Sequence, residues 1–593
     1  MDRILLVEPA YKNKYPPLGL MKISTFHKEY KNDYVKFIKG IYSKEELPGK
    51  WDRIYITTLF TFDYNEVIKT INHYKKFVNN PENNIIIGGI LASLLPDRIF
   101  DATGITPFIG QITCASQIGY SDHTGENIDV MPLDYDILSE IDYEYPAGDN
   151  YFGYTSRGCP NKCSFCAVPK LEPEFQTTNN ILSQIKNINE KYGEKRNLLL
   201  MDNNILNSDN LSGIVEDIKK CGFDKDKPTF IKPAEFLNIY KRIKRRQELS
   251  KEMYKEEIER DSFKMINSLS EFKNKVRVNF LSLYEEIMEN INSKDTIEEK
   301  MIFIEKVYDD LLKIEINAKN RSKLFRYVDF NQGTEAKLLS EEKMKLLAQI
   351  PVKPYRIAFD HLSYEKYYKD AMILASKYGV KNFSNYLLFN YKDKPEDLWE
   401  RLKINIDLAE EIKAADLFSF PMKYAPINQT DRKFVGDHWN KKYIKNIYAI
   451  LNSKKGIVPK KREYFEAAFG KTKEEFMELL MLPKDFIVYR DFFSKIGFSD
   501  KWKELFRKLD KNEKKNLLDY QCGNEIETSN KILKKMFLME NINKRKVEIL
   551  IEEIWNDNSK INNEKLFKMI LEIGEKNISK TLDIKKYIQT NKK

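Results

Sequence analysis

The first hundred residues alternate short apolar runs with longer segments that mix apolar and polar positions. Four apolar runs predict strands at 3–7, 34–38, 53–57 and 84–87. Segments such as 20–30 and 65–77 separate these runs and are long enough for helices. Strands joined by helical crossovers form a parallel sheet that is covered on both faces. We therefore predict an α/β, doubly wound domain over residues 1–110, with a turn-rich, acidic connector over 111–150.

From residue 151 the pattern changes to apolar runs that each end in polar residues. These runs predict six strands, at 151–156, 197–201, 327–330, 355–359, 386–389 and 417–420. A parallel barrel places its catalytic groups at the carboxyl ends of its strands, where these polar residues lie. We predict a partial (β/α)6 barrel over residues 151–430.

Two stretches depart from the barrel pattern. Residues 227–323 are charged and carry an apolar stripe at helical spacing, formed by Leu281, Tyr284, Ile287, Met288 and Ile291. This stretch predicts a helical insertion between the second and third barrel strands. Residues 431–593 read as an α-helical C-terminal region, in which Thr472 starts a helix with acids in its first turn. A phosphate loop at 470–472 is discounted, because Phe465 stands where such a loop needs glycine.

Composition narrows the class of protein. The chain of 593 residues is 42% hydrophobic and 32% charged, and it holds no apolar stretch of about 18 residues, so we expect no membrane span. The start has no secretory pattern, which predicts a cytoplasmic protein. The net charge of +10 and the basic run at 241–246 are the basis for a nucleic-acid partner as an alternative. For most charges of residues 227–323, the simpler interpretation is a solvated helical hairpin.

Three of the six cysteines fall within eight positions, at Cys159, Cys163 and Cys166. Such a trio suits either a four-coordinate zinc or an iron–sulfur cluster. Zinc needs a fourth ligand, and the candidates Cys114, His123 and Cys221 belong to no second paired motif. The zinc interpretation is therefore incomplete.

The Cys-x3-Cys-x2-Cys spacing resembles the signature of the radical S-adenosylmethionine superfamily. Arg157 and Gly158 before the first cysteine, and Phe165 before the last, also agree with that signature. The resemblance implies a [4Fe-4S] cluster held by the three cysteines, with S-adenosylmethionine on the fourth iron. It further implies reductive cleavage to a 5'-deoxyadenosyl radical, and an electron donor such as flavodoxin or ferredoxin.

The same resemblance suggests which residues bind the cofactor. Phe165 and its loop would lie beside the adenine, and Asp202 and Asn203, after the second strand, would hold the methionine end of S-adenosylmethionine. An Asp or Asn is also common at any strand-to-loop junction. Polar residues at the ends of the later strands are second-rank candidates for the ribose and the substrate: Gln332, Asp360, His361, Asn390 and Lys423.

The N-terminal domain resembles the cobalamin-binding-type domain that precedes some radical S-adenosylmethionine barrels, in the segments 15–20 and 88–89. Family members that coordinate cobalt through a histidine carry Asp-x-His-x-x-Gly after the first strand. Here that loop reads Glu8-Pro9-Ala10-Tyr11-Lys12, without histidine. Cobalamin is therefore an alternative cofactor, and a degenerate domain that covers the active site is the preferred interpretation.

These observations predict a radical S-adenosylmethionine enzyme that abstracts hydrogen from an organic substrate. Three alternatives stay open: a cobalamin-dependent methyltransferase, a binding or scaffold protein stabilised by a cluster or zinc, and a nucleic-acid modifying enzyme. A second cluster is not expected, because Cys114, Cys221 and Cys522 stand alone.

Overall fold

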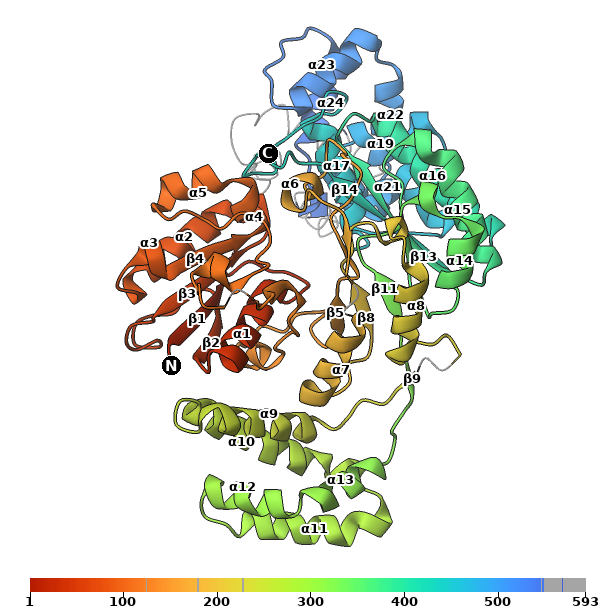
Figure 1. The fold of residues 1–593 in the computed structure, drawn as a ribbon. Helices are drawn as coiled ribbons and strands as arrows, with labels where there is room; N and C mark the ends of the chain where they lie inside the picture. The colour runs from red at the N-terminus through yellow and green to blue at the C-terminus, as the bar shows by residue number, and fades with distance from the viewer. Residues whose placement is uncertain (124, 179–180, 227–228, 546, 549–567, 569–593) are drawn as a thin grey trace, which may run out of the picture. The chain divides into compact units, whose positions relative to one another are not determined.

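The computed structural model describes residues 1–123, 125–178, 181–226, 229–545, 547–548 and 568 (Figure 1). The chain divides into two compact units. The first comprises Met1–Arg356, Tyr378–Val380 and Ala425–Arg432, and the second comprises Ile357–Lys377, Lys381–Tyr424 and the residues from Lys433 on. The domain boundaries predicted from the sequence stay predictions.

The first unit begins with a four-stranded parallel sheet in the order β2-β1-β3-β4. Its strands are β1 (Arg3–Glu8), β2 (Tyr34–Lys39), β3 (Arg53–Thr58) and β4 (Ile85–Gly89). The prediction of a small parallel sheet is confirmed, and each strand lies within two residues of its predicted range. Because the chain moves in one direction from β1 to β2 and in the other from β3 to β4, right-handed crossovers place their helices on opposite faces.

The helices of this sheet are α1 (Leu18–Tyr30), α2 (Tyr64–Tyr74), α3 (Pro81–Asn84), α4 (Ile90–Leu94) and α5 (Pro96–Thr103). The helix predicted at 65–77 ends at Tyr74 and is followed by a 3-10 turn, Lys75–Phe77. On one face of the sheet, residues such as Leu5 and Ile56 pack in a buried apolar cluster with Ile71 of α2. Alternation along the strands therefore supplies both faces with apolar side chains.

The first three predicted barrel strands form a parallel sheet in the order β11-β8-β5. They are β5 (Tyr151–Gly153), β8 (Leu198–Leu200) and β11 (Val328–Phe330), with α7 (Ile181–Tyr192) before β8, α8 (Leu211–Lys220) after it and α14 (Glu341–Leu347) after β11. The strand predicted at 151–156 is wrong in its second half. β5 ends at Gly153, and residues 156–157 instead form β6, which pairs with β7 (Gln176–Thr177).

The predicted insertion is helical in the structure. Two short antiparallel strands, β9 (Thr229–Phe230) and β10 (Leu324–Phe325), close its base. Its helices are α9 (Glu235–Ser250), α10 (Lys255–Phe272), α11 (Val278–Asn292), α12 (Ile297–Lys306) and α13 (Tyr308–Ile316). Tyr284, Ile287 and Ile291 of the predicted stripe are buried, whereas Leu281 and Met288 pack at the margin of the same cluster. The helical spacing in the sequence therefore identified the buried face.

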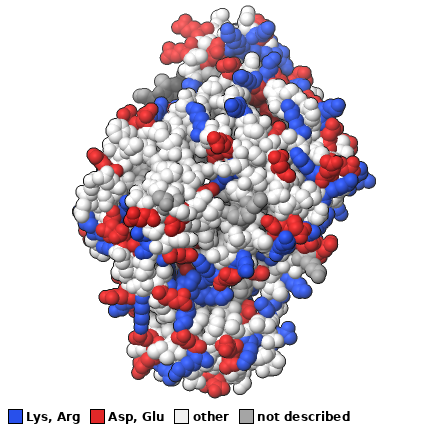
Figure 2. Space-filling model, in the orientation of Figure 1, with Lys and Arg blue, Asp and Glu red and all other residues white. Residues whose placement is uncertain are grey.

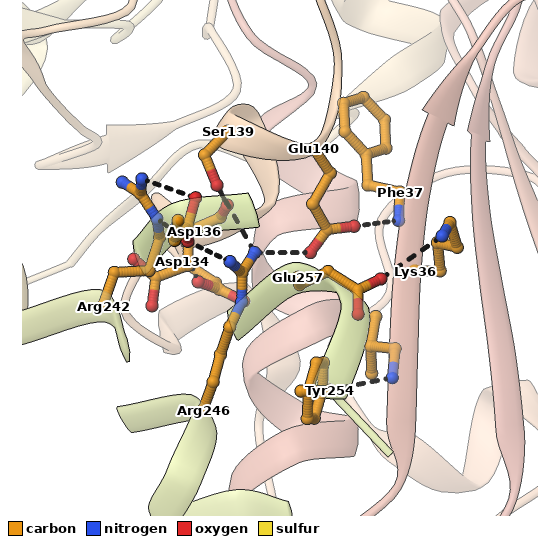
Figure 3. Close-up of polar contacts among 12 residues, drawn as sticks. Lys36, Phe37, Asp134, Asp136, Ser139, Glu140, Arg242, Arg246, Tyr254 and Glu257 are labelled. Carbon is orange, nitrogen blue, oxygen red and sulfur yellow. Dashed lines mark hydrogen bonds and ion pairs between the residues drawn. The ribbon is translucent and has the colours of Figure 1, made fainter. Parts of the chain in front are cut away.

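The helices α9 and α10 dock on the N-terminal sheet through buried charges (Figure 3). Arg246 pairs with Asp261 of α10 and with Glu140 of the connector, whose other carboxylate oxygen accepts from the amide of Phe37 in β2. Tyr254 packs in the apolar cluster of the sheet, and its hydroxyl oxygen accepts from the Val35 amide at 3.0 Å. The insertion is thus anchored to the edge strand β2.

The basic run at 241–246 is part of this docking. Arg242 pairs with Asp261 at 2.7 Å, Arg245 pairs with Asp136 at 2.6 Å, and Lys244 pairs with Glu305. Figure 2 shows Lys and Arg interspersed with Asp and Glu on the face in view. Arg242, Lys244 and Arg245 of the basic run therefore form ion pairs within the first unit. A nucleic-acid partner stays a prediction.

The second unit contains a sheet in the order β12-β13-β14-β15. Its strands are β12 (Tyr355–Ala358), which begins in the first unit, β13 (Asn382–Phe389), β14 (Asp416–Lys423) and β15 (Val458–Pro459). β13 and β14 are parallel, whereas β15 is antiparallel and was not predicted. The six predicted barrel strands thus occupy two sheets in the described part of the chain, and their closure into a barrel stays a prediction.

Helices complete the second unit. α15 (Glu365–Lys377) and α16 (Pro395–Glu411) connect the strands. The C-terminal helices are α17 (Lys441–Asn452), α18 (Arg462–Phe469), α19 (Lys473–Met481), α20 (Lys484–Val488), α21 (Arg490–Lys495), α22 (Phe498–Arg507), α23 (Lys511–Gln521) and α24 (Lys531–Glu540). The predicted cap is confirmed, because the Thr472 hydroxyl accepts from the Glu475 amide. Residues 546, 549–567 and 569–593 of the predicted α-helical C-terminal region lie outside the described residues. Among the described helices, none has the length and apolar character needed to cross a bilayer.

Candidate functional site

The three cysteines lie in one loop that is closed at its base. β6 (Ser156–Arg157) and β7 (Gln176–Thr177) pair in antiparallel register, Ser156 with Thr177 and Arg157 with Gln176. We call residues 158–175, between these strands, the cysteine loop, and the paired strands its neck. The short helix α6 (Val168–Leu171) follows the last cysteine. All three thiols are therefore carried by a segment whose two ends are held together.

Gly158 is required at the neck. Its φ is +72°, a left-handed conformation that side chains rarely adopt, and a Cβ there would lie 2.1 Å from the carbonyl oxygen of Glu174. The glycine of the sequence motif thus permits the two sides of the loop to approach each other directly before the first cysteine.

None of the three loop cysteines is in a disulfide. Cys163 is exposed, and Cys159 and Cys166 are half-buried. Cys166 accepts from the Val168 amide at 3.5 Å, and Cys159 accepts from the Asn204 side-chain amide at 3.7 Å. Among the described residues, no three His, Cys, Asp or Glu side chains are grouped so that they could hold a metal ion. Cysteine thiolates are the ligands of iron–sulfur clusters, so the residue type fits such a cluster. The three sulfurs would have to come closer together to bind one.

Glu172, which the sequence analysis did not single out, closes the neck. Its Oε2 accepts from the Gly158 amide at 2.7 Å and from Asn203 Nδ2 at 2.8 Å. Its Oε1 accepts from Arg157 Nη1 at 3.0 Å and from Gln111 Nε2 at 3.1 Å. One carboxylate thus joins both sides of the loop to the residue after β8. The sequence carried one indication of Glu172, which is Arg157 of the motif, because an arginine that becomes buried needs a carboxylate partner.

Arg157 also pairs with an acid of the connector. Asp129 accepts from both Nε and Nη2 of Arg157, and it receives Lys22 Nζ from α1 at 2.8 Å. Arg157 lies 3.4 Å from the centre of the Tyr154 ring. Burial lowers the pKa of Lys22 to about 8, although Asp129 opposes this shift. Burial alone would raise the pKa of Asp129, but Lys22 and Arg157 outweigh it and lower that pKa.

Asp202 lies beneath the neck and is occupied by it. Its Oδ1 accepts from the Thr155 amide at 2.9 Å, and from the hydroxyls of Thr155 and Ser156 at 2.7 Å each. These bonds explain why residues 155–156 leave the sheet after β5. Burial raises the pKa of Asp202, against the effect of these hydrogen bonds. Its Oδ2 is buried and has no hydrogen-bond partner in the described part of the chain. The contacts make Asp202 an anchor of the loop, and its role toward S-adenosylmethionine stays a prediction.

Two further residues reach the cysteine loop. The side-chain amides of Asn204 and Asn161 both donate to Oε2 of Glu335, at 2.7 and 2.8 Å. Glu335 follows β11, so it links this strand to the loop. Phe165 is half-buried in the loop, whereas Gln332, after the same strand, is exposed. Sequence reasoning selected Gln332 and missed Glu335, because both are polar residues after a strand and only their contacts distinguish them.

The remaining candidates belong to the second unit. Asn390 is fully buried with a φ of +65°, and its side chain bonds the Gly436 amide and the carbonyls of Tyr424 and Phe434. The His361 ring accepts from the Ser363 amide at the start of a short 3-10 turn. Burial raises the pKa of Asp360, with Arg401 opposing it. Lys423 is the last residue of β14. The contacts of Asn390 are those of a turn-stabilising residue.

The loop after β1 contains no histidine. Glu8, the last residue of β1, is buried and pairs with Lys39 at 2.6 Å, with Tyr145 and Asn13 also donating to its carboxylate. Tyr143 of the connector donates to the Asn13 carbonyl at 2.6 Å. Ligands of open α/β sheets bind outside the carboxyl ends of the strands, and here side chains of the chain itself fill the position beside β1. A cobalamin held by a histidine of this loop does not fit.

Comparisons with known proteins give little. No protein-family model matches the sequence, and no curated protein matches it. The fold is similar to a solved structure of the radical S-adenosylmethionine methyltransferase TsrM from Kitasatospora setae, which has a tryptophan substrate and a SAM analog bound. The TM-score is 0.39 at 11% sequence identity, over 72% of this chain and 75% of that one. A likeness of this degree supports no assignment by itself.

Proposed function

We propose that this protein is a radical S-adenosylmethionine enzyme. The observation that supports the proposal is the cysteine loop, which carries three cysteines at Cys-x3-Cys-x2-Cys spacing, outside any disulfide, and is closed at its base by the paired strands of the neck. Structural cysteines are usually buried, whereas these are half-buried or exposed. A loop built this way can gather three ligands while its base stays in place.

Cys159, Cys163 and Cys166 would hold a [4Fe-4S] cluster. When bound, such a cluster supplies one electron from a flavodoxin- or ferredoxin-type donor, which breaks the C5'–S bond of S-adenosylmethionine to give methionine and the 5'-deoxyadenosyl radical. Side chains of the protein itself hold the loop. Asp202 bonds the residues that lead into the neck, Glu172 bonds Gly158 at the start of the loop, and Asn204 donates to Cys159. Hydrogen abstraction from an organic substrate is the expected outcome.

The test is anaerobic reconstitution with iron and sulfide. We expect a brown protein with about four irons per chain and an EPR signal from the reduced cluster. With dithionite as the reductant, it should form 5'-deoxyadenosine. Cys163→Ala should abolish the cluster, whereas Cys522→Ala, at a half-buried cysteine of the second unit, should retain it. A colourless protein with one zinc per chain would contradict the proposal and favour a scaffold role.

A cobalamin-dependent methyl transfer is the second candidate, favoured by the doubly wound sheet at the N-terminus. Because the loop after β1 contains no histidine, this candidate requires a corrin held without a histidine ligand from that loop. Purification with added hydroxocobalamin distinguishes the two. A corrin spectrum that persists through gel filtration would support methyl transfer, and its loss would support hydrogen abstraction alone.

A further inference from the structure

Four hydrogen bonds converge on the carboxylate of Glu172, and their donors come from three different parts of the first unit. Gly158 and Arg157 stand immediately before the first cysteine, Asn203 follows β8, and Gln111 belongs to the connector. A carboxylate can accept about four hydrogen bonds, so this side chain is saturated. Its donors come from the neck, the sheet and the connector, and Glu172 itself lies six residues after Cys166.

The position of Glu172 decides where the cysteine loop begins. The Gly158 amide adjoins the first cysteine in the chain, and it is held at 2.7 Å by Oε2. The same oxygen accepts from Asn203 at 2.8 Å. One atom of Glu172 therefore holds the start of the loop close to the segment that follows β8. Gly158 has no side chain that could take over this role, because the backbone of Glu174 occupies the space.

The other oxygen orients Arg157. Arg157 lies between Glu172 and Asp129, with its guanidinium against the Tyr154 ring. Charge-assisted hydrogen bonds to a planar guanidinium restrict its orientation more than a bond to a neutral partner does. The side of the neck that carries the first cysteine is therefore fixed by acids from both sides.

We propose that Glu172 is the positioning residue of the cysteine loop: it holds the neck in the conformation from which Cys159, Cys163 and Cys166 can gather around one cluster. This inference rests on the proposed function. Glu172 contacts neither cluster nor substrate in this role, and it acts through Gly158, Arg157 and Asn203.

The sharpest variant is Glu172→Gln, which keeps the size of the side chain. A glutamine has one accepting oxygen and one donating nitrogen. Whichever way it turns, its NH2 group faces two donors, either Gly158 and Asn203 or Arg157 and Gln111. Glu174→Gln is the matched control, because Glu174 is exposed and only two residues away. Glu172→Asp retains the charge on a shorter side chain and should fall between the two.

The first measurement is hydrogen–deuterium exchange of the protein without metal, which does not depend on the cluster. We expect the peptide containing Gly158 to exchange about tenfold faster in Glu172→Gln than in the wild type, because a charge-assisted hydrogen bond is lost. Peptides from β1 to β4 should exchange unchanged, which shows that the variant is folded. Glu174→Gln should match the wild type throughout.

The second measurement is iron per chain and the EPR spectrum after anaerobic reconstitution. We expect Glu172→Gln to take up less than about half of the wild-type iron and to give an altered EPR spectrum of the reduced cluster. Its far-UV circular dichroism spectrum should match that of the wild type. Unchanged exchange at Gly158 or unchanged iron uptake in Glu172→Gln would overturn the inference. Wild-type protein that takes up no iron would instead contradict the proposed function, while the exchange result would still report on the neck.

Discussion

Two arginines of the first unit are each buried between two carboxylates, yet they hold different kinds of structure. Arg246 lies between Asp261 and Glu140 and joins the helices α9 and α10 to the connector beside β2. Arg157 lies between Asp129 and Glu172 and stands two residues before the first cysteine. The comparison shows that a buried ion pair identifies a junction. Only the residues next to it, three closely spaced cysteines in one case and packed helices in the other, distinguish a candidate site from a structural junction.

The largest effect is expected at the structural junction. Arg246→Met should lower the free energy of unfolding by about 3–5 kcal/mol, because it removes the arginine that pairs with the buried Glu140, while Asp261 keeps Arg242. Chemical denaturation followed by circular dichroism measures this loss. Iron uptake per folded chain should stay at the wild-type value, and a selective loss of iron would erase the distinction between the two arginines.

Arg157→Met should affect both stability and the cluster. Asp129 keeps Lys22, and Glu172 keeps Gly158, Asn203 and Gln111. We therefore expect a smaller loss of about 1–3 kcal/mol, together with reduced iron after reconstitution. Iron content and the denaturation midpoint are measured on the same preparation. Full iron uptake in this variant would place Arg157 in the same structural class as Arg246.

A buried histidine sharpens the comparison through pH. His27 of α1 contacts Asp33 at 2.9 Å and Tyr55 at 3.0 Å and is fully buried. Burial lowers its pKa, with Asp33 opposing. In the unfolded chain His27 binds a proton near pH 6.5, whereas in the folded chain it does so only at a lower pH. The folded state is therefore most stable with respect to this group above about pH 6.5, and it loses stability as the pH falls.

The pH dependence of unfolding from pH 7 to pH 5 measures this effect. The wild type should lose stability more steeply than His27→Gln, by at most about 1.4 kcal/mol per pH unit. The iron-binding properties of the loop should not follow this profile. Parallel profiles for the two proteins would show that His27 does not titrate in this range.

The smallest effect is expected at a surface pair of the same basic run. Lys244→Ala removes the partner of Glu305 at the surface of the insertion. An exposed pair contributes little, so the free energy of unfolding should change by less than about 0.5 kcal/mol. Thermal unfolding compares this variant with Arg246→Met, two positions along the helix. A large loss in Lys244→Ala would show that position in the run, rather than burial, determines stability.

Local pattern predicted the fold well where apolar residues alternate regularly. The four strands of the N-terminal sheet and the helical insertion with its buried Tyr284 and Ile287 appear where the sequence places them. β15 has two residues, one of them proline, and therefore carries no strand pattern. The split after Gly153 was missed because Asp202, a residue 46 positions beyond Ser156, draws Thr155 and Ser156 away from the sheet.

The chemical identity of the site is local to the sequence. The spacing of Cys159, Cys163 and Cys166, and the glycine before them, are readable without a structure, since ligand chemistry and backbone freedom belong to single residues. The partners of these residues are not readable. Glu172, Glu335 and Asp129 contribute through carboxylates whose donors come from distant parts of the chain, and an acidic residue in a loop looks the same whether it is solvated or paired. The sequence alone therefore identified the candidate ligands, whereas only tertiary packing decided which acids hold the loop that carries them.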